Sequence, residues 1–192
     1  MFTHEQLMAM IRKEKISEQY PYSENDDNVL LDYLKPLLAE MKRAKIRYTM
    51  ESNHFGSGYA SYIQLLCYTD DFVTNTQSGV FRIEKRQGLH VLISRLAPVI
   101  AICGGSEMIE FDESGAENNR GETMVDHPNE LQIEPHFEPL RNQLIRLFMK
   151  YHFTNIQQED VDKPLPFDAH IRTLSRSRGK YLVWDAVFYW ED

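Results

Sequence analysis

Residues 59–69 of this chain read Tyr-Ala-Ser-Tyr-Ile-Gln-Leu-Leu-Cys-Tyr-Thr. In an extended strand, successive side chains point to opposite faces of the sheet. The alternation gives one face Tyr62, Gln64, Leu66 and Tyr68 and the other face Ile63, Leu65 and Cys67. Both faces are largely apolar, which is typical of a strand that is covered on both sides. We therefore predict a central strand here.

Further strands are expected on both sides of this segment. Their residues alternate or form short apolar runs, and the segments are 46–52, 80–85, 89–96, 99–103 and 108–111. Residues 89–103 form either two strands or one long strand interrupted at Pro98, and Gly104-Gly105 is interpreted as a turn. Consecutive strands with short connections pair antiparallel. A parallel sheet would need crossover helices, for which the sequence between 46 and 111 leaves no room.

Helices are predicted on both sides of the sheet segment in the sequence. Thr3 and Gln6 form a potential capping box before a short apolar stripe. A longer helix follows, because Leu30, Leu34, Leu37 and Met41 recur at helical spacing. Pro36 lies inside that pattern, so it either kinks this helix or begins a second one.

The expected fold is therefore α+β, a single domain over residues 1–192. It has a mainly antiparallel sheet of about five to seven strands, with helices packed on one face. The predicted parts are N-terminal helices over 3–45, the sheet over 46–111, an exposed acidic loop over 112–128, a helix over 139–152 and a C-terminal strand over 181–190.

The composition restricts the possible partners. Twenty-one basic and 29 acidic residues give a formal net charge of −8, which disfavours binding to nucleic acid or to anionic membranes. No apolar run approaches the roughly 18 residues of a membrane span, and the N-terminus does not resemble a signal peptide. Cys67 and Cys103 lie in apolar runs, as buried free thiols do. We expect a cytoplasmic protein.

No sequence motif indicates catalysis. The glycine pairs do not extend into a phosphate-binding loop, and no two histidines have metal-ligand spacing on a helix. The group Glu134, His136 and Glu138 is better interpreted as a polar helix entry than as a metal site. No nucleophile elbow is present. We therefore predict no catalytic residue, no cofactor and no metal, and we favour a protein that is not an enzyme.

The first functional hypothesis is a non-catalytic protein-binding module. Its size and acidity are those of small inhibitors that neutralise a basic partner, such as bacterial immunity proteins, although this likeness is one of type and rests on no motif. Acidic surface groups speed association with a cationic partner and orient it. The candidate contact residues are Glu107, Glu110, Asp112, Glu113, Glu117 and Glu122. The sequence leaves the oligomeric state open.

The alternative is an enzyme or small-ligand-binding protein with a pocket on the sheet that has no sequence motif. A curved antiparallel sheet covered by helices can enclose such a pocket. The candidate lining residues are Tyr48, Tyr62, Tyr68, His90 and Arg95. A deep pocket with converging polar groups would favour this alternative, whereas a flat or convex acidic face would favour the first hypothesis.

Overall fold

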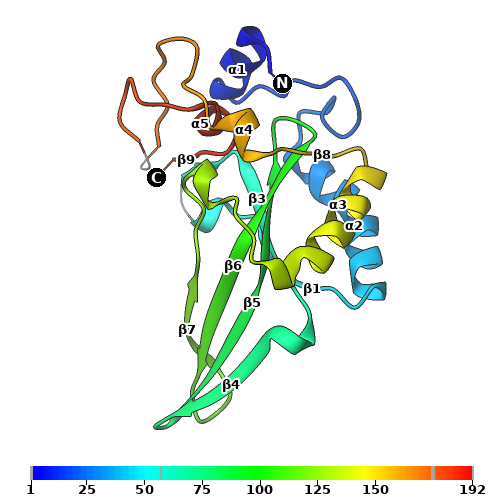
Figure 1. Cartoon of the computed structure of the whole chain (residues 1–192), viewed down its shortest axis with the longest axis vertical. Coiled ribbons are helices and arrows are strands. Elements are labelled where there is room, and N and C mark those ends of the chain that lie inside the picture. The colour runs from blue at the N-terminus through cyan, green and yellow to red at the C-terminus, as the bar shows by residue number, and fades with distance from the viewer. Residues whose placement is uncertain (1, 57, 174–175, 192) are drawn as a thin grey trace.

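The fold is α+β, as the order of helical and extended segments predicts. The computed structural model describes residues 2–56, 58–173 and 176–191. These ranges contain a curled antiparallel sheet of seven strands, a small second sheet and five α-helices (Figure 1). None of the helices in the described ranges has the length and apolarity that a membrane span requires.

The main sheet has the strand order β1-β3-β5-β6-β7. Its path strands are β1 (Arg47–Glu51), β3 (Tyr62–Tyr68), β5 (Phe81–Ser94), β6 (Val99–Phe111) and β7 (Glu117–Glu122). Two further strands join this path, β4 (Val73–Ser78) antiparallel to β5 and β8 (Thr154–Asn155) parallel to β6. The second sheet pairs β2 (Tyr59–Ala60) with β9 (Trp190–Glu191). The central strand predicted over 59–69 is confirmed over residues 62–68 as β3, which is buried along its whole length, whereas residues 59–60 form β2 of the second sheet.

Three of the five helices lie where the sequence predicts helices, and the last two were not predicted. In chain order, the helices are α1 (His4–Ile11), α2 (Asp27–Arg43), α3 (Glu138–Lys150), α4 (Gln158–Val161) and α5 (Val183–Val187). The capping box of α1 is present, since the Gln6 amide donates to Thr3 Oγ1 at 3.1 Å and the Thr3 amide donates to Gln6 Oε1 at 3.0 Å. Helix α2 continues through Pro36 without dividing.

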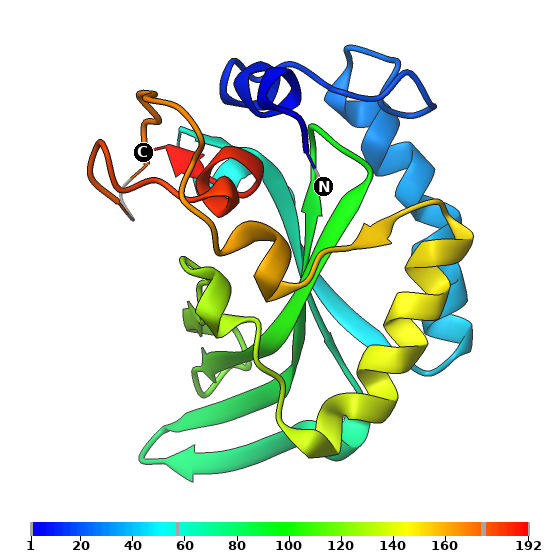
Figure 2. The same ribbon diagram turned by 45° about the horizontal axis from the view of Figure 1, so that its top comes forward.

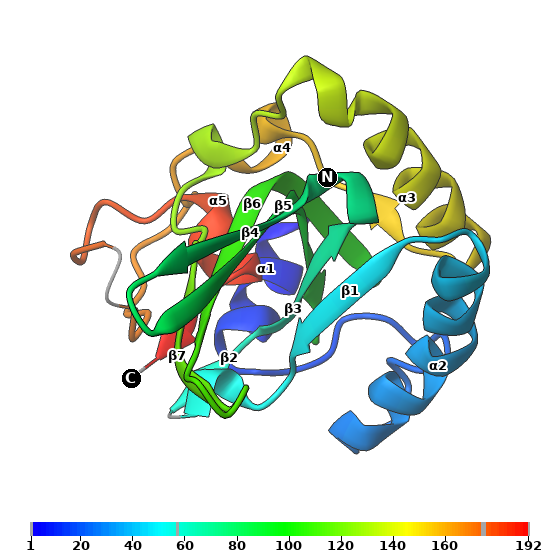
Figure 3. The same cartoon turned by 90° about the horizontal axis from the view of Figure 1, so that it is seen from below.

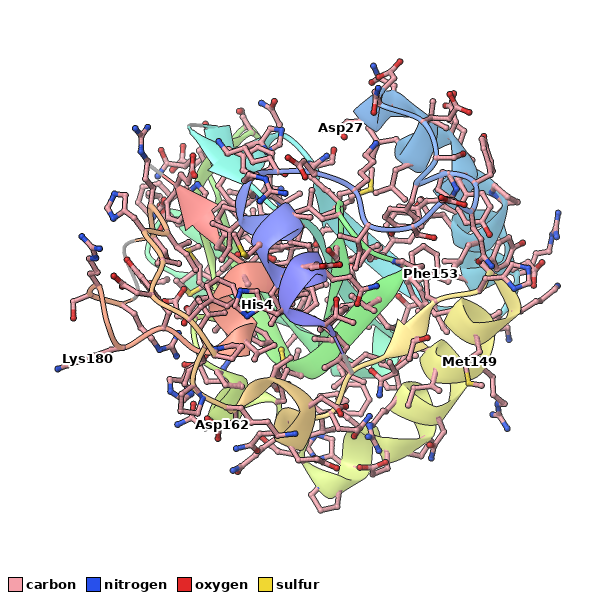
Figure 4. The ribbon with its side chains drawn as sticks, turned by 90° about the horizontal axis from the view of Figure 1, so that it is seen from above. His4, Asp27, Met149, Phe153, Asp162 and Lys180 are labelled. Carbon is pink, nitrogen blue, oxygen red and sulfur yellow. The ribbon has the colours of Figure 1, made fainter. Side chains whose placement is uncertain are left out.

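Two apolar clusters lie on opposite faces of the sheet. Helices α2 and α3 run side by side on one flank and cover Ile63, Leu65 and Val91 (Figure 2). The other face is covered only at its upper end, where α1 and α5 pack over Tyr62 and Leu92 (Figure 4). Below that cluster the second face carries buried polar residues, among them Gln64, His90 and Glu107, beside the apolar Leu66 and Ile109.

The strands β5 and β6 are long enough to carry the sheet well past the helices. At its lower end β5 pairs with β4 over residues 81–86, and β6 pairs with β7 over residues 107–111. These four strands form a projecting arm, residues 73–88 and 105–122, which points away from both termini (Figure 1). Strands β4 and β7 are bonded on one side only and are largely exposed.

The predicted turn at Gly104-Gly105 is wrong, because β6 runs through both residues. The glycines in these strands permit close approach. A Cβ atom at Gly105 would lie 2.2 Å from Cδ2 of His90, and one at Gly88 would lie 2.1 Å from the Cys67 carbonyl oxygen. Gly88 and Gly105 are cross-strand partners, so the two longest strands have their glycines at the same level.

Two predicted boundaries also need correction. The segment 112–128 is not a continuous loop, because residues 117–122 form β7 and extend the sheet beyond the predicted limit of 111. The segment 181–190 is not a strand, because it contains α5 and only its last residue belongs to β9. Asp185 accepts a hydrogen bond from the Leu182 amide at 2.7 Å and pairs with Arg176, which favours a helical turn over the intrinsic preference of the aromatic and β-branched residues for strands.

Candidate functional site

The curled sheet brings its two outer path strands toward each other. The curl can be followed from below in Figure 3, where β1 and β7 are labelled. These two strands lie at opposite ends of the strand order, yet both line one pocket of about 260 Å³. We call it the acidic pocket, and its lining residues are Thr49, Met50, Glu51, Glu107, Arg120 and Glu122. It opens from the uncovered part of the second face, which we call the trough.

A buried glutamine connects the two walls of the acidic pocket. Gln64 on β3 is the cross-strand partner of Glu51 on β1. Its Nε2 donates to Oε1 of Glu122 on β7 at 2.8 Å, whereas its Oε1 is buried and has no hydrogen-bond partner in the described part of the chain. This orientation follows from the contact, since the opposite one would place the amide oxygen against the carboxylate.

His90 lies next to this glutamine in the centre of the sheet. Its Nε2 contacts Oγ1 of Thr123 at 2.8 Å, and Thr123 in turn donates to the Ser106 carbonyl. With the hydroxyl proton directed to Ser106, His90 Nε2 is the donor. Burial lowers the pKa of His90 to about 4, against the opposing effect of nearby carbonyl groups, so the ring is neutral at pH 7. His90 Nδ1 lies 3.6 Å from Oε1 of Glu122 and has no hydrogen-bond partner in the described chain.

Glu107 is the most buried carboxylate of the trough, with 1% of its side chain exposed. It accepts from Arg86 Nη1 at 2.8 Å and also pairs with Arg120. Both arginines have second partners, Glu84 for Arg86 and Glu117 for Arg120. These five side chains therefore compensate one another within the protein.

Glu51 and Glu122 are the two carboxylates of the acidic pocket that lack such compensation. Neither forms an ion pair with lysine or arginine among the residues that the structure describes. Glu51 Oε1 caps the following turn by accepting from the Asn53 and Phe55 amides. Burial, and then the charges of Glu107 and Glu51, raise the pKa of Glu122 against the hydrogen bond from Gln64.

The structure divides the six acidic residues that the sequence singled out. Glu107 and Glu122 are cross-strand partners at the acidic pocket, whereas Glu110, Asp112, Glu113 and Glu117 lie toward the tip of the β6–β7 hairpin. Asp112 accepts from the amides of Ser114 and Ala116, which holds the pKa of its carboxyl below the usual range and makes it part of the turn. Asn118 hydrogen bonds to Glu110. Glu113 has no such contact among the described residues.

A second, basic pocket of about 490 Å³ adjoins the acidic pocket at Thr49. Its basic lining residues are Lys42, Lys45, Arg47 and Arg86. Arg47 pairs with Asp70 at 2.7 Å, and Arg47 and Arg86 both lie over the ring of Tyr68, at 5.5 and 5.4 Å from its centroid. The trough therefore has opposite charges at its two pockets.

The five lining residues proposed for a sheet pocket do not form one site. Tyr48 and Tyr68 line the basic pocket and His90 lies beneath the acidic one. Tyr62 belongs to the apolar cluster under α1 and α5. Arg95 is buried and donates to the Ser52 carbonyl at 2.7 Å. Sequence reasoning missed Glu51 and Gln64 as site residues, and only the strand register brings them together.

The two cysteines are buried free thiols. Burial raises the pKa of Cys103 to about 12 and raises that of Cys67 as well, so neither thiol is poised as a nucleophile, and both are free. Among the described residues, no group of three His, Cys, Asp or Glu side chains is arranged to hold a metal ion.

A larger hollow of about 530 Å³ lies near the N-terminus. Its lining includes Lys13, Lys15 and Asp27, which form ion pairs at its rim.

Glu122→Gln should make the protein more stable at pH 7. The raised pKa means that the folded protein binds the Glu122 proton more tightly than the unfolded chain does, so its contribution to stability is present below about pH 4.5 and is lost as pH rises through the folded pKa. Glutamine keeps an acceptor for Gln64 and carries no charge. Urea unfolding of both proteins from pH 4 to 8 measures the difference, which should grow with pH. A difference that is constant over this range would contradict the assignment.

Comparison of the chain with protein-family models, with curated proteins and with solved structures finds no match.

Proposed function

We propose that this protein is a cytoplasmic, non-catalytic protein-binding module that neutralises a basic partner, as an immunity-type inhibitor does. The observation that carries the proposal is the projecting arm, whose two outer strands β4 and β7 are exposed and bonded on one side only. The arm holds seven acidic and four basic residues within 73–88 and 105–122. An exposed strand edge offers backbone groups to another chain, and the excess of carboxylates favours a cationic one.

The arm also explains why the acidic residues of this region are arranged as they are. Glu107 and Glu117 hold arginines in place, and Asp112 shapes the turn, so these three give the hairpin its form. Glu110 and Glu113 remain to face a partner. Reversing the charge of Asp112 or Glu117 would disturb the hairpin, and Glu110 and Glu113 are therefore the better positions for a test.

Reversing both charges in Glu110→Lys with Glu113→Lys should slow association with the partner by about tenfold, because steering depends on the charge near the contact. The matched control is Glu18→Lys with Glu159→Lys, which changes the net charge equally on exposed positions outside the arm. Each protein is immobilised in lysate of the native host at low and moderate salt, and retained proteins are identified by mass spectrometry. Association rates are then measured with the purified partner.

The proposal predicts one basic protein in stoichiometric amount, released as salt rises, with a slower association rate only for the arm variant. Equal rates for the arm variant and the control would remove the arm from the interface. Retention of no protein by the wild type at low salt would contradict the binding-module function itself.

A second candidate function, small-ligand binding, is favoured by one observation. Gln64 and His90 are polar residues buried at the centre of β3 and β5, where apolar residues would pack at lower cost, and each has one polar atom without a partner in the described chain. A buried polar atom without a partner costs stability, and a bound ligand that pairs with it is one physical explanation for its presence. This candidate needs no arm, so it predicts ligand binding in the trough that the reversal at Glu110 and Glu113 leaves unchanged.

A further inference from the structure

The acidic pocket has hydrogen-bond acceptors in excess of donors. Among the described residues, three carboxylates, those of Glu51, Glu107 and Glu122, line it with one cationic side chain, Arg120. Behind this lining, Gln64 Nε2 donates to Glu122, and Gln64 Oε1 and His90 Nδ1 have no hydrogen-bond partner in the described chain. Glu51 uses one of its oxygens for two backbone amides. A partly buried carboxylate without a cation beside it is destabilised by the loss of water, so a ligand that brings donors and positive charge to Glu122 offsets that cost.

The charges of the pocket indicate the same kind of ligand. Glu51 and Glu122 stand on opposite walls, and neither has a basic partner in the described ranges. The nearest arginine, Arg120, is bound to Glu107 and Glu117. A single positive charge between Glu51 and Glu122 would therefore meet two carboxylates that are not otherwise compensated.

The size of the pocket suits a group no larger than a side chain. A volume of about 260 Å³ is below the range of roughly 300–1,000 Å³ that holds drug-sized molecules. A lysine ammonium carries three donors and no acceptor on a slender apolar stem. Its N–H groups match the carboxylate oxygens of Glu51 and Glu122, both of which line the pocket.

We infer that the acidic pocket binds the ammonium group of one lysine side chain of the basic partner, held between Glu51 on β1 and Glu122 on β7. This inference rests on the proposed function, because it names the chemistry by which the partner is recognised. The pocket lies in the trough at the base of the arm, so a chain that contacts the arm can place a lysine in it.

The test uses n-butylammonium as a probe of the pocket alone. In two-dimensional NMR spectra at fixed ionic strength, it should shift the Gln64 side-chain amide signals saturably, together with the backbone amides of Glu51 and Glu122. The uncharged 1-butanol should leave these signals in place. Glu122→Gln and Glu51→Gln retain the acceptors for Gln64 and the backbone, and each should weaken butylammonium binding at least tenfold, whereas the exposed control Glu113→Gln should not.

Absence of a saturable shift at Gln64, or equal binding by Glu122→Gln and the wild type, would overturn the inference. The same would follow if n-butylguanidinium bound more tightly than n-butylammonium, since the site would then be built for arginine. A second experiment uses the captured partner protein. Glu51→Gln should reduce the amount of this partner that the immobilised protein retains. If butylammonium does not bind but the protein still captures its partner, this inference alone is wrong. If butylammonium binds but the protein captures no partner, the proposed function alone is wrong.

Discussion

Gly88→Ala should lower the free energy of unfolding by about 3 kcal/mol, which corresponds to roughly 10 °C in the melting temperature of a chain of this length. A Cβ atom at this position would lie 2.1 Å from the backbone carbonyl oxygen of Cys67. The carbonyl belongs to β3, which is hydrogen bonded on both sides to β1 and β5, so it cannot move without disturbing the centre of the sheet. Thermal and urea unfolding measure the effect.

Gly121→Ala is the matched control, because a Cβ atom there would meet nothing within 4 Å. Its effect should stay within about 0.5 kcal/mol. The Gly88 variant should also weaken butylammonium binding, since Gly88 stands between Arg86 and His90 on the trough face of β5. Equal stability of the two alanine variants would show that β3 and β5 are not in close contact at Gly88.

The periodicity of apolar residues correctly predicted the elements that are buried in the same way along their whole length. The helix over 27–43 and the central strand over 62–68 each bury one continuous pattern, and local sequence agrees with tertiary packing there. The C-terminal segment shows the opposite case. Its run of aromatic and β-branched residues favours a strand, but the buried pair of Asp185 with Arg176 fixes a helical turn, and a pair nine residues apart leaves no local signal.

Glycine was the residue most easily misinterpreted. Gly104-Gly105 has the composition of a turn, yet Gly105 lies in the middle of β6 and leaves space for the ring of His90. A glycine that permits close approach and a glycine that permits a turn look identical in a sequence. The partner that needs the space, His90, is 15 positions away and becomes adjacent only through the register of β5 and β6.

Only half of the candidate site could be predicted from the sequence, because strand register brings together residues that lie far apart in the chain. Glu107 and Glu122 belong to an acidic region that composition identifies. Glu51 and Gln64 come from other strands, and they meet Glu122 because the sheet curls until β1 and β7 line one pocket. A polar residue inside an apolar strand, as Gln64 is, was the one local signal that pointed to this site.

Glu107→Ala should lower the free energy of unfolding by about 3 kcal/mol, because removing one partner leaves buried charges uncompensated. The side chain of Arg86, 13% exposed, would keep only Glu84 as a partner. The exposed control Glu113→Ala should change stability by less than about 0.5 kcal/mol. If Glu107 were instead a surface contact residue, the alanine variant would unfold like the wild type. Replacing both Glu107 and Arg86 by methionine should recover most of the loss, since the pair would be removed together.

Glu107→Ala also distinguishes a structural role of Glu107 from direct binding of the ammonium group. While Glu107 holds Arg86 and Arg120, neither arginine can neutralise Glu51 or Glu122, and the acidic pocket keeps its charge. Without Glu107, Arg120 retains only Glu117 and becomes free to pair with Glu122, two residues along the same strand. Glu107→Ala should therefore weaken butylammonium binding although Glu107 need not touch the ammonium, and adding Arg120→Met to Glu107→Ala should restore it. Binding that stays weak in the double variant would instead make Glu107 a direct ligand of the cation.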